Sequence, residues 1–201
     1  MEGGTRAPER EPGAFDRLVA FSDGVFAIAI TLLVLSLSVP DDLPAEQIDN
    51  YLFDHWGQVF AYFLSFAVIG RFWLSHHRHF DLLDRSDDRL LAINLVYLAF
   101  VCLIPFPTAV LGDFDLTGTS VALYAGVMGT ASAVHYAMTR YTLRELVRPS
   151  RRDELADLAR QLWPIPIVFF GSIPLGFVSP EAGALAWLLL SADGLRQRLA
   201  R

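Results

Sequence analysis

Long apolar runs constrain this chain more than any other feature. The first of them, from Gly24 to Val39, reads GVFAIAITLLVLSLSV and contains no charged residue. A bilayer core about 30 Å thick needs roughly 20 apolar residues per helix to cross it. Five further windows have suitable length, so we predict an all-α integral membrane protein with six transmembrane helices. The approximate spans are 20–39, 56–75, 90–111, 119–139, 162–178 and 182–195.

Composition supports a membrane protein. Of the 201 residues, 53% are hydrophobic and 12% are aromatic, and the mean hydropathy is +0.38. These values are higher than those of ordinary soluble domains of this length. A cleaved signal peptide is the competing interpretation of the first span. That span is longer than a secretory apolar region and lacks a small-residue cleavage site, which favours a retained helix.

The basic residues indicate how the chain is oriented. All 16 are arginines, in four groups at 6–17, 71–89, 140–160 and 196–201. Six spans would place all four groups on one side of the membrane. The three loops on the other side contain acidic residues and no basic residue: 40–54, 112–118 and 179–181. Because cytoplasmic loops are enriched in arginine, we predict that both termini are cytoplasmic.

Residues 1–14 are polar and contain glycine and proline, so we expect them to form a disordered cytoplasmic tail. A six-helix membrane domain is expected to follow over 15–198. Prolines cluster at Pro105 and Pro107 and again between 164 and 174. Each proline removes a backbone donor, which predicts kinks or helix ends at these positions.

Signatures of common enzymes are absent from the sequence. It contains no G-x-S-x-G, H-E-x-x-H or Walker A motif, and its one cysteine excludes a cysteine pair at metal spacing. We therefore predict that the protein is not an enzyme and holds no cofactor or resident metal. The segment HHRHF, with His76, His77 and His79 before Asp81, is compatible with a metal site, but polar residues at a cytoplasmic helix end are the favoured interpretation.

Two other arrangements found in channels are excluded. The arginines between 140 and 152 are interrupted by Glu145 and Pro149, so this stretch is predicted to be a solvated, phosphate-facing loop and not a voltage sensor. No TVGYG sequence is present to supply a carbonyl filter.

The first span has an apolar stripe and a polar start. Five residues fall on the stripe at helical spacing: Phe21, Val25, Ile28, Leu32 and Leu35. Helix packing is one explanation of such a stripe. An aspartate within hydrocarbon costs roughly 2.5 to 3.5 kcal/mol, so Asp23 is expected near the cytoplasmic boundary with a partner on another helix or on exposed amides.

The start of the first span resembles the prokaryotic TMEM175-type potassium channels. The resemblance rests on R-x-x-x-F-S-D, formed by Arg17, Phe21, Ser22 and Asp23, which runs into GVFAIAITLLVLSL. It continues with W-x-x-H-x-R-x-F, from Trp73 through His76 and Arg78 to Phe80, and with LLAINLVYLAFVCLIPFPTAVLG. These motifs cover the first three spans, whereas the last three match by hydropathy and spacing.

The resemblance implies a homotetramer in which each subunit contributes its first helix to a central pore. It implies a constriction of aliphatic side chains, which fall here on Ile28, Leu32 and Leu35, with a threonine layer at Thr31. Alternatively, the Thr31 hydroxyl bonds back to the Ala27 carbonyl of its own helix.

The resemblance also gives the polar start a structural role. It implies that Arg17, Ser22 and Asp23 join Trp73 and His76 in a network that holds the pore helix. A buried network of this kind is favourable only when every member is satisfied.

The leading hypothesis is a passive, potassium-preferring channel in the inner membrane of a prokaryote. Its expected partners are potassium ions, membrane lipids and further copies of the chain, with no nucleic acid. One alternative is a proton-coupled transporter that uses Asp23, His76 and Arg17 as a relay. A second alternative is a membrane scaffold without transport activity.

Overall fold

The computed structural model describes residues 13–114 and 116–187. Every regular element in these two ranges is helical. The α-helices are α1 (Ala14–Leu32), α2 (Ile48–Asp54), α3 (Trp56–Asp81), α4 (Asp88–Leu103), α5 (Pro105–Asp113), α6 (Gly118–Glu145), α7 (Arg152–Leu162), α8 (Pro164–Val178) and α9 (Pro180–Leu185). Short 3₁₀ segments are η1 (Leu33–Ser36), η2 (Ala45–Gln47) and η3 (Pro149–Arg151). Most of the expected tail over 1–14, and 188–195 of the predicted sixth span, lie outside the described residues.

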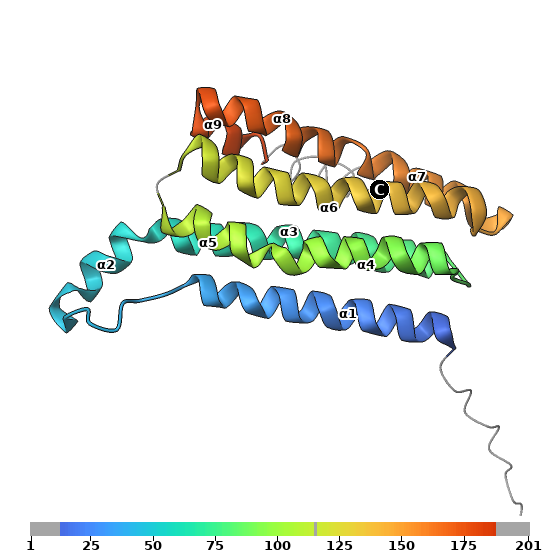
Figure 1. Cartoon of the computed structure of the whole chain (residues 1–201), viewed down its shortest axis with the longest axis horizontal. Helices are drawn as coiled ribbons and strands as arrows, with labels where there is room; N and C mark the ends of the chain where they lie inside the picture. Colours follow the sequence, from blue (N-terminus) through green and yellow to red (C-terminus); the bar gives the residue numbers. More distant parts are fainter. Residues whose placement is uncertain (1–12, 115, 188–201) are drawn as a thin grey trace, which may run out of the picture.

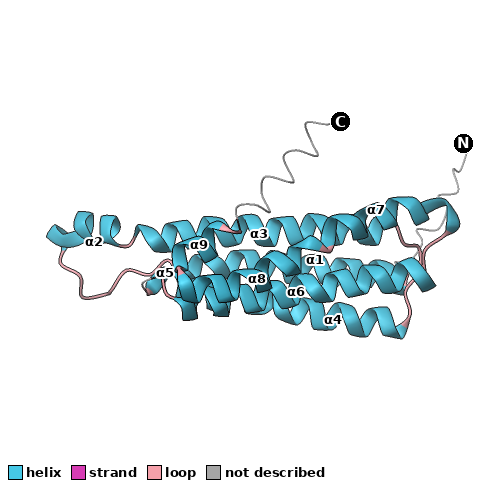
Figure 2. Cartoon of the chain, turned by 90° about the horizontal axis from the view of Figure 1, so that it is seen from above, coloured by secondary structure: helices cyan, strands magenta, loops and turns pink. Residues whose placement is uncertain are grey.

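The long helices lie side by side in a bundle (Figure 1). Helix α1 forms one edge, and its main contacts are with α3 and α4. Helices α7, α8 and α9 form the opposite edge, where they pack on α6. The short helix α2 projects beyond one end of the bundle in both views (Figures 1 and 2).

The described residues contain four segments that are long and apolar enough to cross a membrane. They are Phe15–Ser36, Trp56–Asp81, Asp88–Asp113 and Pro149–Val178. This confirms a multi-pass helical protein. The predicted fourth span, 119–139, falls in α6, a 28-residue helix that is not among the four. Its glycines, serines and threonines make it less apolar than its neighbours.

Helix boundaries differ from the predicted spans in two instructive places. The first span begins at Ala14 instead of residue 20 and changes to a 3₁₀ helix at Leu33. The predicted span 90–111 is split into α4 and α5, as its prolines indicated. Pro105 has no amide to donate, and the Val101 carbonyl accepts the amide of Ile104 instead, at 3.2 Å. The chain therefore kinks at Ile104.

Most of the stretch predicted as a loop between 140 and 152 is helical, so that prediction was wrong outside residues 146–148. Helix α6 continues to Glu145, and α7 begins at Arg152. Helix α7 is amphipathic, with Leu155, Leu158 and Leu162 buried against the bundle. Its charged residues face outward, because leucines at three- and four-residue spacing give the helix one apolar side.

Hydrogen bonds between helix ends order the arginine-rich end of the bundle. Asp87 caps α4 by accepting the Leu90 amide at 2.8 Å, and it also accepts a bond from the Tyr141 hydroxyl of α6. These two bonds, that from Tyr141 first, lower the pKa of the Asp87 carboxyl below its ordinary value. A 2.7 Å ion pair between Arg148 and Asp84 joins the two connections at this end.

Small residues allow α6, α8 and α9 to approach closely. A Cβ atom added at Gly176 would lie 2.6 Å from a γ-carbon of Val121 on α6. A Cβ at Gly183 would lie 2.8 Å from the Cα of Gly176 itself. Beside this contact, the Trp187 indole donates to Ser172 at 2.8 Å. Side chains larger than glycine at these positions would separate the helices.

We expect Gly176→Ala to destabilise the bundle by about 1 to 3 kcal/mol, because the added methyl overlaps a packed side chain. The measurement is thermal unfolding of the detergent-solubilised protein. Gly171→Ala is the matched control on the same helix, since nothing lies within 4 Å of a Cβ built there. Equal stability of the two variants would contradict the proposed close packing.

Candidate functional site

Helix α1 has one face buried in the bundle of its own chain. The buried residues follow helical spacing through Leu18, Ser22, Phe26, Ala29 and Leu33. Phe26 packs against the rings of α3 and α4, with its centroid 5.5 Å from His76 and 6.0 Å from Tyr97. This face fixes the rotation of α1 about its axis.

The stripe identified in the sequence lies on an adjoining face of α1 and continues into η1. Its large apolar side chains are exposed: Phe21 by 53%, Ile28 by 59%, Leu32 by 40% and Leu35 by 73%. Val25 is half-buried. Nothing lies within 4 Å of a Cβ built at Gly24, so the chain leaves this face open. Within the single chain, the stripe residues other than Val25 therefore do not serve as internal packing.

Thr31 lies on the same exposed face. Its hydroxyl donates to the carbonyl of Ile28 at 2.8 Å, which is one residue away from the Ala27 acceptor considered from the sequence. The Thr31 side chain is exposed. The oxygen can thus accept one more contact from outside the helix.

The polar start of α1 is tied to α3 by an aspartate. The indole nitrogen of Trp73 donates to an Asp23 carboxylate oxygen at 2.9 Å. Asp23 is half-buried. Its partner lies on another helix, whereas the sequence had left open either such a partner or the exposed amides of a helix end. Arg17 is exposed on α1, six residues before Asp23. A hydrogen bond to a charged acceptor stabilises more than a neutral one.

A second tie connects three helices through buried side chains. The Asn94 amide of α4 donates to the Ser22 hydroxyl at 3.0 Å, and its carbonyl oxygen lies 2.8 Å from Nε2 of His76 on α3. The Ser22 hydroxyl in turn donates to the Leu18 carbonyl at 2.9 Å. All three side chains are almost fully buried. The structure thus brings Ser22 and His76 together only through Asn94.

The histidines of HHRHF do not behave as interfacial residues, so the favoured interpretation was wrong for two of them. His76 and His79 are buried, because they face inward on α3. His79 lies 2.7 Å from the Thr142 hydroxyl of α6. His77 alone is half-exposed, with Nε2 3.4 Å from Asp81. No group of three metal-ligating side chains is found among the described residues.

Two important residues were missed from the sequence. Asn94 is the one strongly polar side chain in the apolar run of α4, and that isolation was the available signal. His135 of α6 is buried, with its ring centroid 4.9 Å from that of Tyr97 and 5.7 Å from that of His79. Only the folded structure shows that His135 lies beside Tyr97 and His79.

Known proteins are similar to this chain in sequence and fold. A family profile described as "Endosomal/lysosomal potassium channel TMEM175" matches residues 17–105. A potassium channel of Chamaesiphon minutus is 33% identical over 181 residues, which are 86% of this chain and 88% of that protein. The chain belongs to the TMEM175 family. This confirms the resemblance drawn from the motifs around Asp23 and His76.

Two further comparisons concern this TMEM175 family member. A potassium channel of Streptomyces collinus is 44% identical over 116 residues, 56% of each chain. The crystal structure of a lysosomal potassium-selective channel TMEM175 homolog from Chamaesiphon minutus superposes with a TM-score of 0.80 at 31% identity. It covers 90% of this chain and 97% of that one. The TMEM175 fold therefore extends through the last helices, where sequence motifs were weak.

We expect Asn94→Leu to destabilise the folded subunit by about 1 to 3 kcal/mol, because it leaves Nε2 of His76 buried without its partner. Thermal unfolding of the purified protein measures the effect. The double variant with His76→Phe removes both polar partners and is expected to lose less than the sum of the single losses. Strict additivity would show that the two side chains are not coupled.

Proposed function

We propose that this chain is one subunit of a potassium channel, whose ion path is formed by the exposed face of α1. The observation that carries the proposal is the division of α1 into a face held by its own bundle and an open face of aliphatic side chains. Relatives that share most of the chain are named potassium channels. An enzymatic activity is not part of the proposal.

The constriction would consist of Ile28, Leu32 and Leu35, with the Thr31 hydroxyl beside them. Ile28 and Leu35 are more than half exposed in the single subunit. A narrow ring of aliphatic side chains excludes water and closes the pore by dewetting. An ion passes only if it sheds part of its hydration. Potassium holds its water less tightly than sodium, so a dry constriction favours potassium without a carbonyl cage.

The two ties to α3 and α4 would hold this helix in register. Asp23 with Trp73, and Ser22 with Asn94, anchor the first half of α1. The half that carries Ile28 and Leu35 is thereby presented away from the bundle. Arg17 belongs to the same end of the helix and completes the proposed anchor.

Assembly and orientation complete the proposal. An open α1 face at the bundle edge suits a homotetramer with four such faces around one axis. The helix ends that carry arginines, including those between α3 and α4 and between α6 and α7, gather at one end of the bundle (Figure 1). This supports six spans with both termini cytoplasmic, in the inner membrane of a prokaryote. Acidic residues of the opposite loops would attract cations within about 8 Å at physiological salt.

The alternatives considered from the sequence are less well supported. A proton relay through Asp23, His76 and Arg17 would need a path for water, whereas His76 is 1% exposed and already bonded to Asn94. A scaffold without transport would leave the open face of α1 without a role. Relatives named as channels favour neither.

We expect the purified protein in liposomes to pass potassium faster than sodium under equal gradients. Fluorescence-based flux and single-channel recording both measure this, and native mass spectrometry of the same sample checks for four copies. Current that follows the electrochemical gradient distinguishes a channel from a saturable carrier. Sodium flux equal to potassium flux would contradict the proposed selectivity.

We expect Ile28→Asn and Leu35→Asn to raise single-channel conductance several-fold, because a polar ring stays wet. Ile167→Asn is the matched control: Ile167 is 58% exposed, like Ile28 at 59%, but lies on α8 at the far edge. Its conductance should equal that of the unchanged protein. Unchanged conductance in both α1 variants would place the ion path elsewhere.

A further inference from the structure

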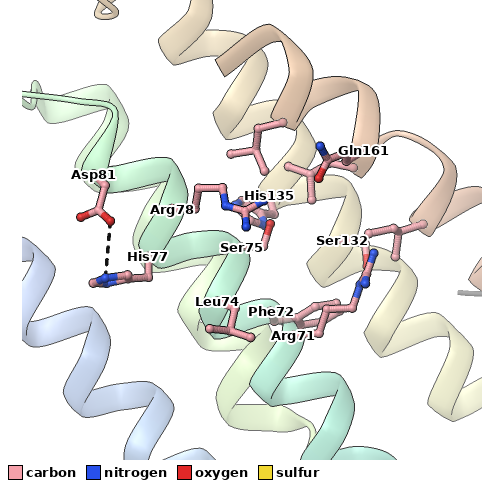
Figure 3. A pocket seen from close by; sticks show the side chains of 13 residues that line it. Arg71, Phe72, Leu74, Ser75, His77, Arg78, Asp81, Ser132, His135 and Gln161 are labelled. Carbon is pink, nitrogen blue, oxygen red and sulfur yellow. Dashed lines mark ion pairs between the residues drawn. The ribbon is translucent and has the colours of Figure 1, made fainter. Parts of the chain in front are cut away.

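A groove lies between α3 and the helices α6, α7 and α8. Its volume is about 380 Å³. Apolar residues line part of it, including Phe72, Leu158, Leu162 and Ile165. Polar groups line the rest, and Figure 3 shows Arg71 and Arg78 extending from α3 toward α6 beside Ser75 and Gln161. The groove is therefore amphipathic, with two cationic groups on one wall.

The charged residues that line the groove are Arg71, Arg78 and Asp81. The Asp81 carboxylate is directed to His77, with the two groups 3.4 Å apart (Figure 3). The Arg78 guanidinium makes no hydrogen bond or ion pair with the residues 13–114 and 116–187. Its guanidinium therefore has donors to offer to a ligand.

The depth of these arginines matches the boundary of a bilayer. Helix α3 has 26 residues, about 39 Å at 1.5 Å per residue, so it extends past a hydrocarbon core of about 30 Å. Arg78 is three residues from the end of α3, at the level where lipid phosphates lie. Arg71 is seven residues deeper, and a long arginine side chain reaches from there toward the interface.

We propose that this groove binds the headgroup of an anionic phospholipid. The lipid phosphate accepts hydrogen bonds from the Arg78 guanidinium, a planar donor group suited to phosphate. The Arg71 side chain adds positive charge deeper along α3 than Arg78. Acyl chains lie along Leu74, which is 52% exposed at the rim. Basic pockets between transmembrane helices on the cytoplasmic side bind such headgroups.

The apolar rim favours a lipid over free phosphate. A soluble anion would contact only the Arg78 guanidinium. A phospholipid also covers Leu74 at the rim, because its charged head and its chains meet at the depth of Arg78. The site is distinct from the proposed ion path, since α1 does not line the groove.

The test compares lipid retention by the full-length protein using native mass spectrometry during titration with phosphatidylglycerol or phosphatidylcholine. The unchanged protein is expected to retain phosphatidylglycerol preferentially. Arg78→Gln is expected to weaken this retention about fivefold, the effect of one basic residue near a charged lipid. Retention of phosphatidylcholine should not change.

Arg152→Gln is the matched control, because Arg152 is exposed on α7 and does not line the groove. Ser75→Leu provides a second variant that narrows the groove while both arginines remain, and it too is expected to reduce retention. Equal phosphatidylglycerol retention by the unchanged protein, Arg78→Gln and Ser75→Leu would overturn the proposal. Displacement of the lipid by equimolar inorganic phosphate would overturn the assignment to a lipid.

Discussion

One buried asparagine joins the three helices on which the rest of the arrangement depends. Asn94 bonds to Ser22 of α1 with its amide nitrogen and to His76 of α3 with its oxygen. In an apolar bundle these groups have few other partners, so each has a strong preference for this geometry. Because both the nitrogen and the oxygen of the Asn94 amide are bonded, α1 cannot rotate about its axis without breaking a hydrogen bond. This restriction determines which residues of α1 are exposed.

Polar and apolar residues of α1 consequently have separate roles. The charged and hydroxyl groups near Asp23 hold the helix, while Ile28, Leu32 and Leu35 face outward. The α6–α8–α9 layer is built differently, through glycine contacts such as Gly176 against Val121. Close packing at one edge and an open helix at the other give the subunit one rigid side and one side suited to assembly.

The sequence predicted the helical class and the break before Pro105 well, because apolar length and proline chemistry are local properties. It predicted contacts between helices less well. His79 and His135 meet across α3 and α6, 56 residues apart, and no local pattern reports such a distance. The helical character of α7 was detectable, since Leu155, Leu158 and Leu162 repeat at helical spacing, but its many charges obscured it.

The change of helix type at the end of α1 has a geometric consequence for the side chains there. An α-helix turns Leu35 about 60° away from Leu32, whereas a 3₁₀ helix, with three residues per turn, places it in line. The segment Leu33–Ser36 is 3₁₀, so Leu35 is eclipsed with Leu32 and about 6 Å further along the axis at a rise of about 2.0 Å per residue. The side chains of Leu32 and Leu35 are thus aligned along the helix axis. The rise of the backbone, and not the size of the side chains, sets the distance between them.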